Sequence, residues 1–219
     1  MKAPSFRVIS QYIGLFFLLV VFPGVSWIYL QSGFNYQKKL RSELKDLGVV
    51  PDFSLLLTTG DTLTLDSLQD RVSIACFIDT REKINTPLKM KVIHDMLEQF
   101  HDQELDFLIH AANPSSDSLS VLREFAIAAG LDKNHQCKFL TGGEAEMRKL
   151  AAEGYKMPDK FPLNENPYFV LTARQMSKDS TYSRVIKSYC DIRNIDEKKK
   201  LVEHSVMLMS LVDKKVKGR

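Results

Sequence analysis

The side chains best suited to redox or metal chemistry in this sequence are three cysteines, Cys76, Cys137 and Cys190. They form no CxxC pair or other close ligand spacing, and an odd number does not suggest a disulfide framework. Cys76 lies in an apolar run that predicts a buried strand, where a free cysteine usually acts as a small hydrophobic side chain. One alternative is a thiol-dependent reductase or peroxidase that uses Cys76 or Cys190, which would need a lowered thiol pKa and solvent access.

Two other pairs have side chains that could bind a metal. Cys137 follows His135 in a predicted loop, and Met90 and His94 have the i, i+4 spacing that puts two side chains on one helix face. Two donors alone are weak evidence for a metal centre, and such pairs are common by chance. We therefore expect an ordinary surface loop and an ordinary helix at these positions.

The composition is that of a globular chain with one core. The 219 residues are 44% hydrophobic and 26% charged, with only 10 glycines and 8 prolines. These values exclude long disordered, collagenous or repeat architectures. The net charge of +3 provides no strongly basic surface for phosphates, so nucleic acid is not expected as a partner.

An uncharged apolar segment, residues 8–30, predicts one transmembrane helix. At about 1.5 Å per residue, this length matches a hydrocarbon core of roughly 30 Å. A cleaved signal peptide is the competing interpretation, but the apolar run is long for one and the bulky segment 27–30 is a poor cleavage site. Counting the basic residues on the two flanks would place the following domain in the cytoplasm.

The expected organisation has five parts, in chain order: an N-terminal tail (1–7), the transmembrane anchor (8–30), a juxtamembrane stalk helix (31–48) that ends at Gly48, a folded domain (49–213) and a basic tail (214–219).

Within the folded domain, hydrophobic periodicity predicts alternating strands and helices. The expected elements are a β-hairpin of 49–57 and 62–65, a strand at 72–78, a helix after Pro87 to residue 100, a strand at 105–109, a helix at 118–129, a short strand at 139–141, a helix at 144–152, an antiparallel hairpin of 168–171 and 184–189, and a helix at 195–211. This order predicts an α/β thioredoxin-like fold with a central mixed sheet and flanking helices.

Four strings, in this order, resemble the Sco/SenC family, the membrane-anchored thioredoxin-like copper proteins of cytochrome oxidase assembly. VPDFSL (50–55) resembles the family's VPDFxL opening, and FIDT (77–80), with Pro87 downstream, resembles its metal-motif strand and loop. NPSSDS (113–118), which contains Pro114 and Asp117, is similar to its DPxxDT loop, and FLTGGE (139–144) is similar to its FLTG string. The resemblance covers roughly residues 49–212.

The copper ligands of that family are absent from this sequence. The resemblance implies ligation by a CxxxC pair followed by Pro and by a later His. Counting back from Pro87 puts Glu82 and Thr86 at the two Cys positions, and the His position falls at about Glu165. Carboxylate and hydroxyl oxygens are hard ligands that do not retain Cu(I). We therefore expect a degenerate site with no copper and no other cofactor.

The resemblance further implies an accessory or binding role in respiratory oxidase assembly, without enzymatic turnover, through protein partners such as oxidase subunits or other assembly factors. It implies a bacterial inner-membrane protein with a periplasmic domain, which overrides the charge count because long domains cross regardless of flanking charge. An anchor that starts at residue 8 leaves no room for an organelle transit peptide. Two alternatives stay open: a hard-cation site at Glu82 and Glu165, and a cis peptide bond at Pro167, where we favour trans.

Overall fold

The structure is a computed structural model that describes residues 15–68, 71–101, 103–176 and 182–217. Contacts divide the chain after Glu43 into two compact units. The N-terminal unit is a helix, in which a π-helical turn η1 (Phe17–Val21) leads into α2 (Phe22–Glu43). The stretch Phe17–Glu43 is long and apolar enough to cross a membrane, by length and composition. Residues 8–14 of the predicted anchor lie outside the described residues.

The predicted end of the stalk helix at Gly48 is wrong. Helix α2 passes residue 31 without a break and stops at Glu43. Gly48 instead begins strand β1 (Gly48–Val49), and the preceding Leu47 N–H donates to the Ile186 carbonyl at 2.9 Å. The apolar residues keep a helical spacing as far as position 47, which is why the sequence predicts a helix there. Pairing with a distant strand satisfies the backbone groups of this stretch instead, and so outweighs the local helical pattern.

The second unit is built on a mixed sheet with the strand order β1-β8-β7-β4-β5-β6-β2-β3 among the described residues. Besides β1, the strands are β2 (Ser54–Leu57), β3 (Thr62–Thr64), β4 (Val72–Ile78), β5 (Leu105–Ala111), β6 (Cys137–Thr141), β7 (Tyr168–Met176) and β8 (Tyr182–Asp191). Strands β4, β5 and β6 are parallel to one another, and the remaining pairs are antiparallel.

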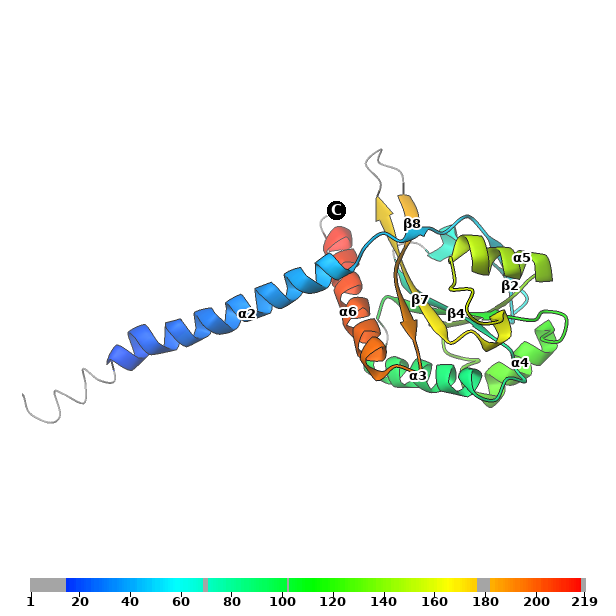
Figure 1. Cartoon of the computed structure of the whole chain (residues 1–219), viewed down its shortest axis with the longest axis horizontal. Coiled ribbons are helices and arrows are strands. Elements are labelled where there is room, and N and C mark those ends of the chain that lie inside the picture. Colours follow the sequence, from blue (N-terminus) through cyan, green and yellow to red (C-terminus); the bar gives the residue numbers. More distant parts are fainter. Residues whose placement is uncertain (1–14, 69–70, 102, 177–181, 218–219) are drawn as a thin grey trace, which may run out of the picture. The chain divides into compact units, whose positions relative to one another are not determined.

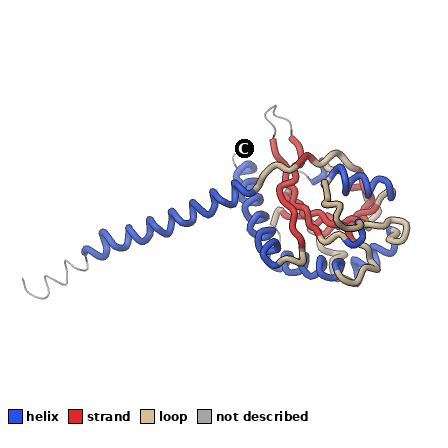
Figure 2. The backbone as a smooth tube through the Cα atoms, in the orientation of Figure 1, coloured by secondary structure: helices blue, strands red, loops and turns tan. Residues whose placement is uncertain are grey.

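Helices cover both faces of this sheet (Figures 1 and 2). One face carries α3 (Asn85–Gln99), α4 (Leu119–Ala128) and α6 (Ile195–Lys217). The other carries α5 (Glu144–Lys149), which continues into a π-helical turn η3 (Leu150–Gly154). Strand β4 is buried on both sides, so its successive side chains enter the two cores in turn. Short 3₁₀ turns η2 (Asp66–Leu68) and η4 (Leu163–Glu165) complete the unit.

This architecture is the predicted thioredoxin-like fold, with the β2–β3 hairpin at its start and the antiparallel β7–β8 pair near its end. Several boundaries differ from the prediction. Strand β6 begins at Cys137, and α6 continues to Lys217, through most of the predicted basic tail. The predicted loop between β7 and β8 includes residues 177–181, which lie outside the described residues.

The predicted first strand, 49–57, is two strands in different parts of the sheet. Val49 in β1 pairs with β8 at one edge, whereas β2 lies near the opposite edge between β3 and β6. The break falls at Pro51, which has no N–H to donate to a sheet ladder. The intervening Val50 and Phe53 are buried, so the crossing segment still contributes to the core.

A histidine lies in the core beneath this crossing. His110 in β5 is fully buried, its ring stacks on that of Phe77 with centroids 5.0 Å apart, and its Nε2 lies 3.1 Å from the Tyr155 hydroxyl. Its Nδ1 has no hydrogen-bond partner among the described residues. Burial lowers the pKa of His110 to about 3, so the imidazole is neutral at neutral pH.

Acid is expected to destabilise the domain through His110. Its pKa is about 3 in the folded chain, against an ordinary value of 6.5, so the unfolded chain takes up this proton first. The free energy of unfolding should fall by up to ~1.4 kcal/mol per pH unit as the pH drops from about 6.5 toward 3, with no contribution above that window. Urea unfolding of the full chain in detergent at stepped pH measures this. His110→Phe should flatten the slope, whereas His135→Phe, at an exposed position, should keep it; equal slopes in the two variants would contradict the assignment.

Candidate functional site

The candidate site lies where strands β4 and β5 end, next to the start of β7. On one side of β4 the chain crosses over to parallel β5, and on the other side lies antiparallel β7. Ligand sites of α/β sheets are found at the carboxyl ends of strands where connections diverge in this way. A hollow of about 520 Å³ opens here and is lined by Asp79, Arg81, Glu82, Ile84, Asn85, Asn164 and Glu165.

The fold brings the three predicted degenerate ligand positions together. Glu82 and Glu165, far apart in the sequence, both line the hollow. Thr86 is 2% exposed and lies beneath the loop. The two segments meet directly, because the Asn85 side-chain amide donates to the Glu165 backbone carbonyl at 2.8 Å.

Glu82 uses both carboxylate oxygens to cap helix α3. Its Oε1 accepts the Ile84 N–H at 2.8 Å and its Oε2 accepts the Thr86 N–H at 2.6 Å. The first N–H groups of a helix have no partner within the helix, and a negative charge there is favoured by the helix dipole. Thr86 in turn donates its hydroxyl to the Asp79 carbonyl at 3.0 Å. Both oxygen-bearing side chains, at the positions where the resemblance predicts Cys, therefore hold the loop and the start of α3.

Pro87, Pro114 and Asp117, which belong to the predicted family motifs, also have structural roles around the site. Pro87 lies in the first turn of α3, where a missing N–H costs no helical hydrogen bond. Pro114 lies in the turn after β5, which carries Asp117 back under the loop after β4. Asp117 is fully buried and accepts the Thr80 hydroxyl at 2.6 Å. Burial raises the pKa of Asp117, and the hydrogen bonds from Thr80 partly oppose this shift.

Lys89 is the main residue of the site that sequence reasoning missed. Its side chain is 1% exposed, and Nζ donates to the backbone carbonyls of Phe77 and Asn166, both at 2.5 Å. Burial lowers the pKa of Lys89, while the nearby Cys76 and Glu82 oppose the shift. The sequence carries a signal for the burial of Lys89, because this residue stands four positions before buried Ile93, on the inward face of an amphipathic helix.

A second hollow, of about 480 Å³, adjoins the first at Asn164. Its wall includes Asn113, Leu163 and the ion pair of Glu144 with Arg148, whose closest oxygen and nitrogen are 2.6 Å apart. Together the two hollows are lined by both acidic and basic side chains, which could contact another polypeptide.

The three cysteines and the two candidate metal pairs lie outside the site. Cys76 and Cys190 are each 1% exposed, and burial raises the pKa of both thiols, and of Cys137, to about 12. Thiols in this state form almost no thiolate at neutral pH, so the structure does not support the thiol-dependent alternative. Met90 is part of the core, and His94 Nε2 lies 3.0 Å from the Ala129 carbonyl. In the part of the chain that the structure describes, no three His, Cys, Asp or Glu side chains gather as a metal site.

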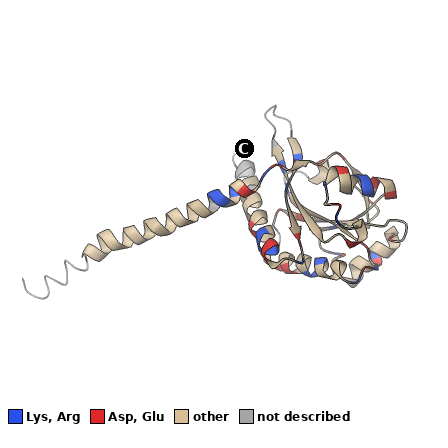
Figure 3. Cartoon of the chain, viewed as in Figure 1, with Lys and Arg blue, Asp and Glu red and all other residues tan. Residues whose placement is uncertain are grey.

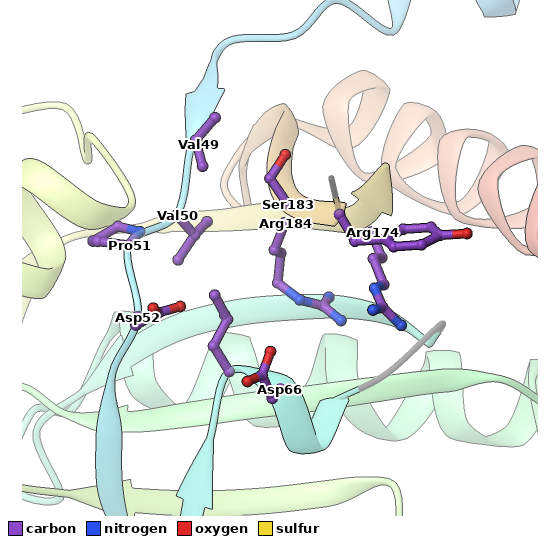
Figure 4. A pocket seen from close by; sticks show the side chains of 10 residues that line it. Val49, Val50, Pro51, Asp52, Asp66, Arg174, Ser183 and Arg184 are labelled. Carbon is purple, nitrogen blue, oxygen red and sulfur yellow. The ribbon is translucent and has the colours of Figure 1, made fainter. Parts of the chain in front are cut away.

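A third hollow, of about 260 Å³, lies beside β1 and β8 (Figure 4). Arg174 and Arg184 line it together with Asp52 and Asp66, so its charges do not select an anion or a cation. Arg184 is buried and donates to the Ser73 hydroxyl and to the Arg71 carbonyl, so it is part of the scaffold of the domain. Basic and acidic residues are also interspersed along the ribbon of this unit (Figure 3).

The family follows from a sequence comparison that agrees with this geometry. A profile of the SCO1/SenC family matches residues 42–172, more than half of the chain. The chain belongs to the SCO1/SenC family. The predicted resemblance is therefore confirmed. A search of curated protein sequences finds no significant match.

Solved structures show that this SCO1/SenC chain has the Sco fold. BsSco, described as a member of the Sco family of cytochrome c oxidase assembly proteins with a disulfide switch, gives a TM-score of 0.59 at 20% identity, over 76% of this chain and 97% of that one. A SCO1/SenC family lipoprotein from Bacillus anthracis gives 0.55 at 12% identity, over 75% and 97%. Yeast Sco1 gives 0.53 at 22% identity, over 73% and 96%.

None of the peptide bonds that the structure describes is cis, so Pro167 is trans, as favoured from the sequence. In this SCO1/SenC chain, the segment before β7 is instead fixed by side chains. Asn166 donates its side-chain amide to the Pro158 carbonyl at 3.3 Å and accepts the Tyr168 N–H at 2.9 Å.

Removing the Glu82 cap is expected to destabilise the SCO1/SenC domain. Glu82→Ala leaves the Ile84 and Thr86 N–H groups without their acceptors, at a cost of about 1–2 kcal/mol in the free energy of unfolding. Denaturant unfolding of the full chain in detergent measures the change. Glu98→Ala, at an exposed position near the other end of α3, is the matched control and should change stability little. Equal stability of the two variants would show that the cap contributes nothing.

Proposed function

We propose that this SCO1/SenC chain is an accessory protein of respiratory oxidase assembly that acts by binding protein partners and does not carry copper. The observation that carries the proposal is the use made of Glu82 and Thr86. At the positions where the family resemblance puts two thiolates, these side chains bond to the backbone of their own loop. Their oxygens are also hard donors, which suit Cu(I) poorly.

The absence of a reactive thiol among the described residues supports binding over turnover. The family's copper and disulfide chemistry both need sulfur in the loop after β4. The nearest cysteine in the sequence, Cys76, is buried within β4, and burial raises the pKa of its thiol to about 12. A protein with this scaffold and no reactive thiol among its described residues can still recognise the partners that its relatives recognise.

The partners that we propose are respiratory oxidase subunits or other assembly factors. The structural relative BsSco is described as belonging to a family of cytochrome c oxidase assembly proteins. The rim of the hollow offers an apolar contact, because the Ile84 side chain is 68% exposed between polar neighbours. Exposed apolar side chains at a polar rim are a common feature of protein interfaces.

The proposed location is the bacterial inner membrane, with residues 8–30 as a single-pass anchor and the domain in the periplasm. The apolar helix over Phe17–Glu43 supports an anchor of this kind. The runner-up at the same site is a hard cation held by Glu82 and Glu165. It is less well supported because the two Glu82 oxygens already accept backbone N–H groups.

Copper titration is the first test. The full chain in detergent, titrated with Cu(I) against a competing chelator, is expected to show no stoichiometric binding at submicromolar affinity. The triple variant Glu82→Cys, Thr86→Cys and Glu165→His, which restores thiolate and imidazole donors on the same two segments, is expected to gain such binding. Tight stoichiometric binding by the wild-type chain would refute the proposal. Calcium and magnesium titrations of the same sample test the hard-cation alternative.

Affinity capture tests the binding role. The full chain, captured from detergent-solubilised membranes, is expected to bring down oxidase subunits or assembly factors. Ile84→Glu, at the rim of the hollow, should lower their recovery several-fold, because a charge replaces an apolar contact. Ile127→Glu, at a similarly exposed position on α4 that does not line the hollow, is the matched control and should leave recovery unchanged. Recovery that responds equally to the two variants would argue against this interface.

A further inference from the structure

We propose that Lys89 is a positioning residue that permanently joins the two segments of the candidate site, the stretch 77–89 from the end of β4 to the start of α3 and the segment 158–167 before β7. According to the family resemblance, a shared copper ion would link these segments. In this chain the buried link is made by the Lys89 amine, so the site keeps its shape with no ligand bound. This link lies within the domain and does not depend on which partner the domain binds.

The geometry at Nζ supports the link. Phe77 lies near the end of β4 and Asn166 lies just before β7, and Nζ donates to the backbone carbonyl of each at 2.5 Å. Lys89 itself lies in the second turn of α3. Three elements, which are a strand, a helix and a loop, therefore meet at one nitrogen atom.

The segment before β7 is prepared for this contact. Asn166 uses its side chain within its own segment, with bonds to the Pro158 carbonyl and the Tyr168 N–H, which leaves its carbonyl directed to Lys89. A second bond joins the same two segments nearer the surface, from Asn85 to the Glu165 carbonyl at 2.8 Å. The two bonds hold the segment at both a buried and a more exposed point.

Burial argues that this lysine has a specific role. Lysines on helices usually extend their amines to solvent, whereas Lys89 is 1% exposed although exposed Lys91 lies two residues further along the same helix. Burying an amine is unfavourable unless it forms hydrogen bonds, and here two carbonyl oxygens accept from it. Removing Nζ would leave those two carbonyls without this donor and would free the segment before β7.

Hydrogen exchange of the full chain in detergent, followed by mass spectrometry, tests the proposal. Lys89→Met keeps the length of the apolar stem and removes the amine. The amides of residues 163–168 are expected to exchange at least about tenfold faster in this variant, while those of β5 keep their wild-type rates. Lys91→Met is the matched control and should exchange like the wild type throughout.

Two results with Lys89→Met would overturn the proposal. One is unchanged protection at 163–168, and the other is a uniform rise in exchange rate that includes β5 and marks Lys89 as a general stability residue.

If the variant does not fold, the wild-type chain provides the second measurement. Its protection at 163–168 should be the same with a copper chelator and with added Cu(I); a rise of about tenfold or more on adding Cu(I) would mean that a metal makes the link. Copper binding with unchanged protection would instead contradict the proposed function and leave the Lys89 link intact.

Discussion

The structure around the candidate site depends on one constraint: polar backbone groups at the end of β4 are removed from water and must find partners. There the chain leaves a strand that is buried on both faces and starts a helix whose first N–H groups have no partner in the helix. Glu82 supplies acceptors for two of these groups, and Thr86 and Lys89 supply donors for the carbonyls of Asp79 and Phe77. The loop is therefore closed by its own side chains.

This closure means that the site of this SCO1/SenC chain holds its shape without help from a bound ion. A bound ion can hold two segments together only while it is present. Hydrogen bonds from Asn85 and Lys89 to the Glu165 and Asn166 carbonyls hold the same segments at all times. A site held in this way keeps a defined surface without a ligand, which is what recognition of a partner requires.

Burial sets the chemistry of the remaining titratable groups in the core. The same desolvation that raises the thiol pKa of Cys76 to about 12 lowers the imidazole pKa of His110 to about 3. Both groups are therefore neutral, and neither offers a reactive atom to solvent. In this domain Cys76 and His110 form part of the packing, whereas the site itself is made of carboxylate, amide and amine groups.

The sequence by itself determined the order of strands and helices, the thioredoxin-like fold and the family, because these depend on local periodicity and on strings such as 50–55 and 139–144. It also predicted that Glu82 and Glu165 meet at one site. Only the tertiary structure decided what Glu82 and Thr86 do and which two carbonyls Lys89 joins. It also separated residues 49–57 into two strands and ended the stalk helix at Glu43. The physical reason is the same in each case: these outcomes depend on hydrogen bonds to groups distant in the chain, such as Asn166 and Ile186, which no local pattern encodes.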